Sequence, residues 1–384
     1  MAFELSQKIL KYLEDSFEES MALLETLCKI PAPSHHEEKR AAFCKKWLEE
    51  QGAKGVYIDE ALNVVFPWNC EGKDNIVAFL AHTDTVFPDM TEPMPYSTDG
   101  KFAYSPGVGD DTACLVMMLM VAKYIVQNDL KSDRGILIVA NACEEGLGNL
   151  KGVKQVMKDF AGRVERFYTL DGQYRVLVNR CVGSHRYKVS VETKGGHSFN
   201  AFGNRNAICA AAELICALNK CQIPVEEGSK TTFNVGVIQG GTSVNTIAQN
   251  ASFLYEYRSD SYKCLAKMQA FFEETVAKAQ EDPETKITVE VLGIRPCGEA
   301  VDEGIFNEMV QSTKAICEKH SGISCTLGSG STDANIPMSL GIPAICVGTY
   351  LGGGVHTREE YLEIASVPVG LKITAEIILQ YFDC

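Results

Sequence analysis

The sequence of 384 residues has no long apolar segment. No window approaches eighteen consecutive apolar residues, which excludes a transmembrane helix. The N-terminus has neither the basic start nor the apolar core of a signal peptide. We therefore expect a cytoplasmic protein without a membrane partner.

Cysteine pairs and positive charge are also scarce. The fifteen cysteines are odd in number and contain no Cys-x-x-Cys pair, which argues against a disulfide framework and against a thiolate zinc site. We interpret them as buried free thiols. The 50 acidic residues outnumber the 36 basic ones, and the net charge of −14 comes without a basic stripe, which excludes a nucleic-acid partner.

The sequence does contain apolar runs that end in polar residues. Three such runs, rich in Val, Ile and aromatic residues, cover 75–84, 135–145 and 167–171. Runs of this kind suit strands that are buried on both faces of a parallel sheet. A strongly apolar stretch of helical length, 112–127, separates the first two runs, so the order is β-α-β. We predict a layered α/β domain.

The pattern changes near residue 181. Residues 185–193 alternate between polar and apolar side chains, as a half-exposed antiparallel strand does. From there to residue 294 the expected order is β-α-β-β-α-β, the order of a ferredoxin-like α+β module. We therefore predict one domain formed by 1–180 and 295–384, with a second domain, 181–294, inserted into it.

The ends of the apolar runs carry the residues of chemical interest. The first run ends in His82-Thr83-Asp84, the second in Glu144-Glu145 and the third in Asp171. Ligands of open α/β sheets bind outside the carboxyl ends of the strands, so the three ends should meet at one edge. Imidazole and carboxylate groups that meet in this way suggest a metal centre.

Each of these residues also has a simpler explanation. His82 alone is more often a strand-end histidine than a ligand, although Asp84 beside it suits the carboxylate that orients a ligating imidazole. Glu144 and Glu145 fit a solvated turn. However, two adjacent carboxylates at the end of a buried strand repel each other, and a cation or a shared proton would relieve this repulsion.

Two further segments present candidate ligands outside the apolar runs. A glycine-rich stretch leads into Asp110-Asp111, where a helix N-cap and a carboxylate that bridges two cations are both reasonable interpretations. Far downstream, the glycine-rich loop 352–354 presents His356.

The chain resembles a known family over nearly its full length, the dinuclear zinc exopeptidases and amidohydrolases. The resemblance is greatest to the peptidase T-like and carboxypeptidase G-like members. The matching segments occur in the order of the family and are 81–85, 107–111, 143–146, 170–172, 194–198, 240–245 and 356–360. Each segment alone is a weak signal, but their joint agreement is specific.

The resemblance implies a centre of two zinc ions, for which Co²⁺ or Mn²⁺ can substitute. The implied metal ligands are His82, Asp110, Glu145, Asp171 and His356. In this arrangement Asp110 bridges the two ions, Asp84 orients His82, and Glu144 is the general base. In relatives, the peptide bond that corresponds to Asp110–Asp111 is often cis.

The resemblance also implies roles for the inserted domain, which serves the family as a lid and dimerisation domain, so a homodimer is implied. In dimeric relatives the histidine that matches His197 stabilises the oxyanion in the partner's active site. Asn245 and Arg258 match positions that contact substrate, and Arg suits a carboxylate through its bidentate fork. The simpler alternatives are a turn histidine, a turn asparagine and a surface arginine. Further candidates for substrate contact are Ser331 and Thr332.

The implied function is that of a zinc-dependent metallopeptidase. It would hydrolyse small peptides as an exopeptidase, with water activated by two zinc ions and Glu144. Asp171 favours the peptidases, since related deacylases commonly have glutamate there. The alternatives are an N-acyl-amino-acid amidohydrolase and, from another class, a binding protein without catalysis on the same scaffold. An intact set of ligands and base argues against the binding protein, whereas amino- and carboxypeptidase action stay equally open.

Overall fold

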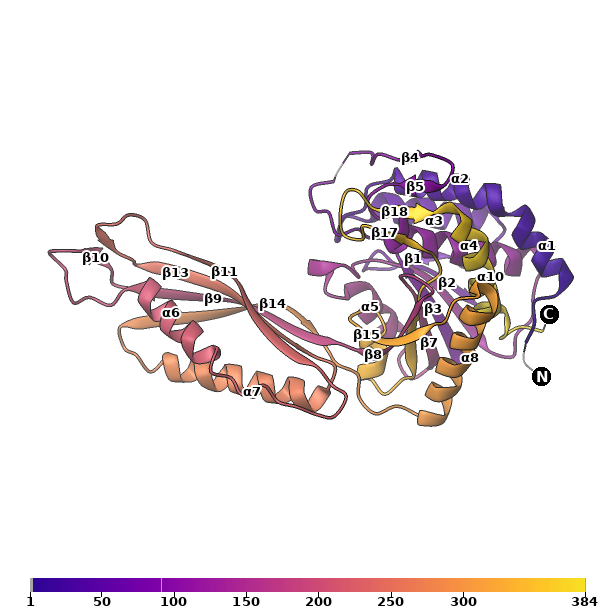
Figure 1. Ribbon diagram of the computed structural model, residues 1–384. Helices are drawn as coiled ribbons and strands as arrows, with labels where there is room; N and C mark the ends of the chain where they lie inside the picture. Colours follow the sequence, from indigo (N-terminus) through magenta and orange to yellow (C-terminus); the bar gives the residue numbers. More distant parts are fainter. Residues whose placement is uncertain (1–2, 91, 384) are drawn as a thin grey trace. The chain divides into compact units, whose positions relative to one another are not determined.

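The structure is a computed structural model that describes residues 3–90 and 92–383 (Figure 1). The chain divides into two compact units. One is formed by Val182–Gly298 and the other by the chain on either side of that segment. Both units combine helices with a sheet, which confirms the predicted α/β class.

The larger unit is built on an eight-stranded sheet with the order β1-β2-β6-β3-β7-β16-β8-β15. The strands are β1 (Tyr57–Ile58), β2 (Val64–Trp68), β3 (Ile76–His82), β6 (Gly135–Asn141), β7 (Val164–Leu170), β8 (Val176–Cys181), β15 (Thr326–Gly330) and β16 (Ala344–Val347). The neighbours β6, β3, β7 and β16 are parallel, and every residue of β3 and β6 is buried. The carboxyl ends of these strands therefore lie at one edge of the sheet.

Helices cover both faces of this sheet. They are α1 (Gln7–Asp15), α2 (Phe17–Cys28), α3 (Glu38–Glu50), α4 (Cys114–Gln127), α5 (Lys151–Asp159), α8 (Glu303–Ser321), α9 (Asn335–Ser339) and α10 (Val367–Leu379). Because side chains alternate along a strand, Val77 and Phe79 of β3 enter a core with α4 and α10, whereas Ala78 and Leu80 enter a second core with α5. Among the described residues, no helix is long and apolar enough to cross a membrane.

A small antiparallel sheet completes the larger unit, with the order β17-β18-β5-β4. Its strands are β4 (Ser97–Thr98), β5 (Phe102–Tyr104), β17 (Gly352–Gly353) and β18 (Tyr361–Glu363). Strands β17 and β18 enclose the loop that carries His356, and β5 leads into the segment that carries Asp110. This sheet thus joins two candidate ligand segments that are distant in sequence.

The inserted unit has a four-stranded antiparallel sheet with the order β11-β13-β9-β14 and a separate pair, β10 and β12. Its elements are β9 (Gly183–Thr193), β10 (Gly196–His197), α6 (Ala207–Leu218), β11 (Thr231–Gly240), β12 (Thr246–Ile247), β13 (Asn250–Ser259), α7 (Tyr262–Ala279) and β14 (Thr285–Arg295). Alternate residues of β13 are buried beneath α6 and α7, which lie on one side of the sheet (Figure 1). The four long strands and two helices follow the predicted β-α-β-β-α-β order.

Arg40 in α3 is a fully buried cation that ties the N-terminal helices to the site edge of the sheet. Its guanidinium donates to the carbonyl oxygens of Leu27, Ile30 and Thr83 at 2.9, 2.8 and 2.8 Å. Burial lowers the pKa of Arg40. Thr83 lies between His82 and Asp84, so Arg40 binds the backbone of the segment His82–Asp84 at its central residue.

We expect Arg40→Met to lower the free energy of unfolding by about 3 kcal/mol. Methionine avoids the cost of burying a charge, but the carbonyl groups of Leu27, Ile30 and Thr83 lose the guanidinium as a donor, and the second effect should be larger. Equilibrium unfolding in urea measures the change. The control is Lys39→Met, at the exposed neighbouring position of the same helix. An Arg40→Met midpoint equal to that of the parent protein would contradict this account.

Candidate metal centre

Five of the predicted site residues meet at the carboxyl edge of the large sheet. They form two groups of possible metal donors, His82, Asp110 and Asp171 in the first and Asp110, Glu145 and His356 in the second. Within each group, one ligand atom from every residue lies within 4.8 Å of the others. Asp110 belongs to both groups. The structure therefore brings together residues from five separate segments of the chain.

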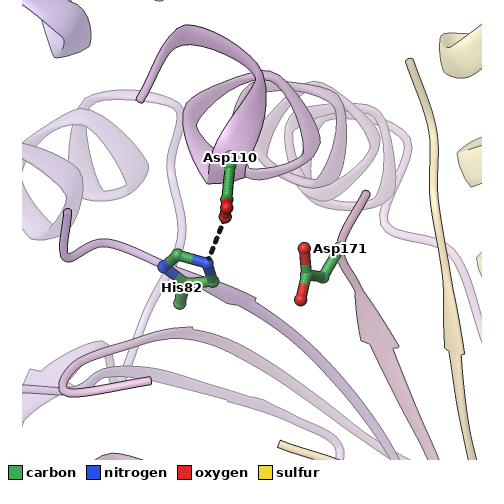
Figure 2. A group of neighbouring side chains, drawn as sticks. All are labelled: His82, Asp110 and Asp171. Atoms are coloured by element: carbon green, nitrogen blue, oxygen red, sulfur yellow. Dashed lines mark hydrogen bonds and ion pairs between the residues drawn. The ribbon is translucent and has the colours of Figure 1, made fainter. Parts of the chain in front are cut away.

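Asp110 directs one carboxylate oxygen to each group. Its Oδ1 lies 3.0 Å from Nε2 of His82, and its Oδ2 lies 3.1 Å from Nε2 of His356. The same His356 nitrogen is 3.3 Å from Oε1 of Glu145. Figure 2 shows the carboxylate of Asp171 turned from the end of its strand toward His82 and Asp110. A carboxylate that directs one oxygen to each of two donor groups has the arrangement of a bridging ligand.

The segment that carries Asp110 is an irregular turn, Val108–Ala113, directly before α4. The Asp110–Asp111 peptide bond is cis, as the family resemblance implies. A Cβ atom at Gly109 would overlap the ring of Tyr350, so this close approach requires glycine. Asp111 is buried, and its Oδ2 accepts the backbone N–H of His82 at 2.9 Å, which joins the turn to the end of β3.

Asp84 holds both His82 and the two glutamates in place. Its Oδ1 accepts the N–H of Glu144 at 2.9 Å, and its Oδ2 accepts the N–H of Glu145 at 3.0 Å and the hydroxyl of Ser34 at 2.6 Å. Nδ1 of His82 lies 3.0 Å from the Asp84 carbonyl oxygen and 3.4 Å from its Oδ1. Burial opposes the ionisation of Asp84, but hydrogen bonds from His82 and Ser34 hold its pKa below the usual value.

The carboxylates of the two groups crowd one another. Burial and then the charge of Asp110 raise the pKa of Asp171 to about 7. Hydrogen bonds to Asp110 and Glu145 raise the pKa of His356 to about 10. Such a concentration of negative charge favours cations. Each group also offers three nitrogen or oxygen donors, the set that proteins use to hold a catalytic metal with a coordination position left open. The residues therefore fit a pair of divalent cations.

Glu144, Ser331 and Thr332 lie outside the two donor groups. Glu144 directly precedes a member of the second group, and the residue is only 6% exposed. Thr332 takes part in the turn before α9, where its N–H donates to Oδ1 of Asn335 at 2.9 Å and its hydroxyl oxygen accepts the N–H of Ala334 at 3.3 Å. A role for Ser331 and Thr332 in substrate contact stays a prediction.

His197 and Asn245 are neighbours in the inserted unit. Strand β10, which contains His197, pairs with β12, which begins directly after Asn245. The N–H of Ser198 donates to the carbonyl oxygen of Asn245 at 2.9 Å. Nδ1 of His197 accepts the N–H groups of Phe199 and Asn200 at 3.3 and 3.4 Å. In the neutral ring the proton is therefore on Nε2, which is free to serve as a donor on this exposed residue.

Arg258 is not close to these two residues within the inserted unit. It lies near the opposite end of β13 from Asn250, eight residues or roughly 26 Å along the strand. Its Nε and Nη2 donate to the two carboxylate oxygens of Glu256 at 3.1 Å each. A substrate carboxylate would have to compete with Glu256 for this guanidinium.

Comparisons with known proteins show which family and fold this chain resembles. A sequence model of peptidase family M20/M25/M40 matches residues 78–380. Carboxypeptidase G2 of Pseudomonas sp. (strain RS-16) is 24% identical over 326 residues, which cover 83% of this chain and 76% of the relative. Acetylornithine deacetylase of Myxococcus xanthus is 27% identical over 225 residues, 56% of either chain. A tripeptidase of Staphylococcus aureus has the same fold, with a TM-score of 0.76 and 22% identity over 94% of this chain and 97% of its own.

Proposed function

Because the chain belongs to peptidase family M20/M25/M40 and is a metal-dependent hydrolase, we propose that it is a dinuclear zinc exopeptidase that acts on small peptides. The observation that carries this proposal is the pair of donor groups that share Asp110. Their nitrogen and oxygen donors suit zinc, and Co²⁺ or Mn²⁺ could substitute for it.

The proposed mechanism divides the work among the site residues. His82 and Asp171 would complete one cation site, Glu145 and His356 the other. When bound, two such cations polarise the scissile carbonyl and lower the pKa of water. Glu144 takes one proton from the attacking water while the water oxygen bonds to the carbonyl carbon. Glu144 then passes that proton to the leaving nitrogen as the C–N bond breaks, which yields a carboxylic acid and an amine. The proton of the acid then moves to the amine, so the final products are a carboxylate and an ammonium group.

The inserted unit would supply the remaining contacts. His197 would donate a hydrogen bond from Nε2 to the oxyanion, as a residue of the partner subunit in a homodimer. The backbone contacts that keep its Nδ1 as an acceptor support this role. Asn245 would contact substrate from the same loop region. Arg258 would bind a substrate carboxylate, which would displace Glu256 from the guanidinium.

The second candidate function is removal of an acyl group from an amino acid. The partial match to acetylornithine deacetylase of Myxococcus xanthus supports it. Both reactions hydrolyse an amide with the same centre, so the donor groups alone do not separate them. The difference lies in the substrate and must be measured.

A substrate screen tests the proposal. Zinc-loaded and cobalt-loaded protein are each incubated with dipeptides, tripeptides and N-acyl amino acids, and the released amine is measured. We expect faster release from the di- and tripeptides than from the N-acyl amino acids. One tripeptide is then tested in two forms, blocked at its amino end or at its carboxyl end. The form that is no longer hydrolysed identifies the terminus that the enzyme recognises.

The Glu144→Gln variant, prepared in parallel, corrects the screen for contaminating peptidases. Hydrolysis of N-acyl amino acids alone would contradict the proposed peptidase function and support the second candidate function, the removal of an acyl group. Protein that binds both metal ions yet cleaves no amide would contradict both functions.

A further inference from the structure

Glu360 is a buried carboxylate that contacts the turn carrying Asp110 through the backbone. It is 1% exposed and stands directly before β18. Its Oε2 accepts the N–H of Gly107 at 2.7 Å, and its Oε1 accepts the N–H groups of Gly109 and Asp110 at 2.9 and 2.8 Å. One side chain thus binds three of four consecutive backbone donors.

These backbone groups need an acceptor of this kind. They lie in or next to the irregular turn directly before α4, and N–H groups that precede a helix have no partner within it. Gly107 has a φ of 71°, and a residue in this left-handed conformation can turn successive N–H groups to one side. An ionised carboxylate binds such a cluster of N–H groups through charge-assisted hydrogen bonds, which are stronger than neutral ones.

Glu360 also joins two of the three segments that supply the second donor group, those of Asp110 and His356. It follows His356 by four residues on the same loop, and its carbonyl oxygen accepts the N–H of Ser105 at 3.2 Å. Asp110, whose N–H it binds, places Oδ2 3.1 Å from His356. A shift of the turn relative to the loop would therefore change the separation of Asp110 and His356.

We propose that Glu360 is a positioning residue that fixes the Asp110 carboxylate between the two donor groups and thereby sets the affinity for the pair of cations. The inference rests on the proposed function, because it takes Asp110 as the shared ligand. Glutamine at this position keeps one acceptor oxygen but turns an NH₂ group toward backbone N–H donors. Aspartate keeps the charge but is one methylene shorter.

The test compares Glu360→Gln with Glu359→Gln, the exposed neighbour on the same loop. Each full-length protein is stripped with a chelator and titrated with Co²⁺, whose visible absorption reports the geometry of its ligands. For Glu360→Gln we expect Co²⁺ affinity to fall about 10- to 100-fold and the absorption band to change. On a cleaved peptide, kcat should fall with little change in KM. Glu359→Gln should match the parent protein.

The outcomes separate this inference from the proposed function. A parent protein that binds no Co²⁺ would overturn both. A parent that binds two ions, with Glu360→Gln equal to it in affinity and absorption, would overturn only the role of Glu360. If far-UV circular dichroism shows that Glu360→Gln is unfolded, Glu360→Asp takes its place, since it keeps the buried charge. Parental affinity and absorption in Glu360→Asp would then overturn the inference.

Discussion

Replacing Glu144 by glutamine is expected to lower kcat for peptide hydrolysis by about 10³-fold while both metal ions stay bound. Glutamine keeps the shape of the side chain but cannot take a proton from water. The backbone N–H of Glu144 donates to Asp84, and this bond does not depend on the side chain, so the segment should stay in place. Steady-state kinetics and elemental analysis of the dialysed protein measure the two effects.

The matched control is Glu145→Gln, one residue further along the chain. Glu145 belongs to the donor group with Asp110 and His356, so its replacement should weaken metal binding first. Glu144→Gln with the kcat of the parent protein, or with lost metal, would contradict the assignment of Glu144 as the base.

The sequence predicts the strands at the site because their signal is local. A strand buried on both faces must be apolar along most of its length, so β3 and β6 are visible as runs of apolar residues. In β7 only the part from Phe167 onward is buried throughout, and that part is the run that the sequence shows. The parallel pairing of these strands places their ends together, which accounts for the meeting of His82 and Asp171. Asp110 and His356 lie in loops without periodicity. Their glycine-rich segments make them candidates, but only the family resemblance assigns them as ligands.

The residues that support the site segments through hydrogen bonds from outside the donor groups cannot be predicted from local apolar runs. Ser34, Arg40 and Glu360 act through hydrogen bonds to residues between 10 and 253 positions away in the chain. Composition and spacing carry no signal for such pairs, because tertiary packing alone brings them together. Glu360 even lies within a segment that matches the family, but a motif does not state which backbone groups a buried carboxylate will bind.

The interaction of Arg258 with Glu256, by contrast, can be predicted from the sequence. Side chains two residues apart on a strand point to the same face, so Glu256 and Arg258 were bound to be neighbours once β13 was predicted. The resemblance directs attention to a substrate carboxylate as the partner of Arg258, whereas strand geometry supplies one from the same strand. Local geometry should therefore be considered before a role is carried over from a family.

Replacing Asp110 by alanine is expected to remove both metal ions and to reduce hydrolysis at least as severely as Glu144→Gln. Asp110 supplies one oxygen to each donor group, so its loss leaves both groups with two protein donors instead of three. Metal content after dialysis measures the first effect directly. Thermal unfolding measures it independently, because a ligand that binds only the folded protein adds about 2.7 kcal/mol at a free concentration of about 100 times its Kd.

The comparison variant is Asp171→Ala, which removes a donor from one group only. It should retain one ion per chain and part of the thermal stabilisation by zinc, whereas Asp110→Ala should retain neither. The contrast depends on the sharing of Asp110, because a single substitution in one of two independent sites would remove at most one ion in total. Two ions bound to Asp110→Ala, or equal metal losses in the two variants, would mean that Asp110 does not bridge the centre.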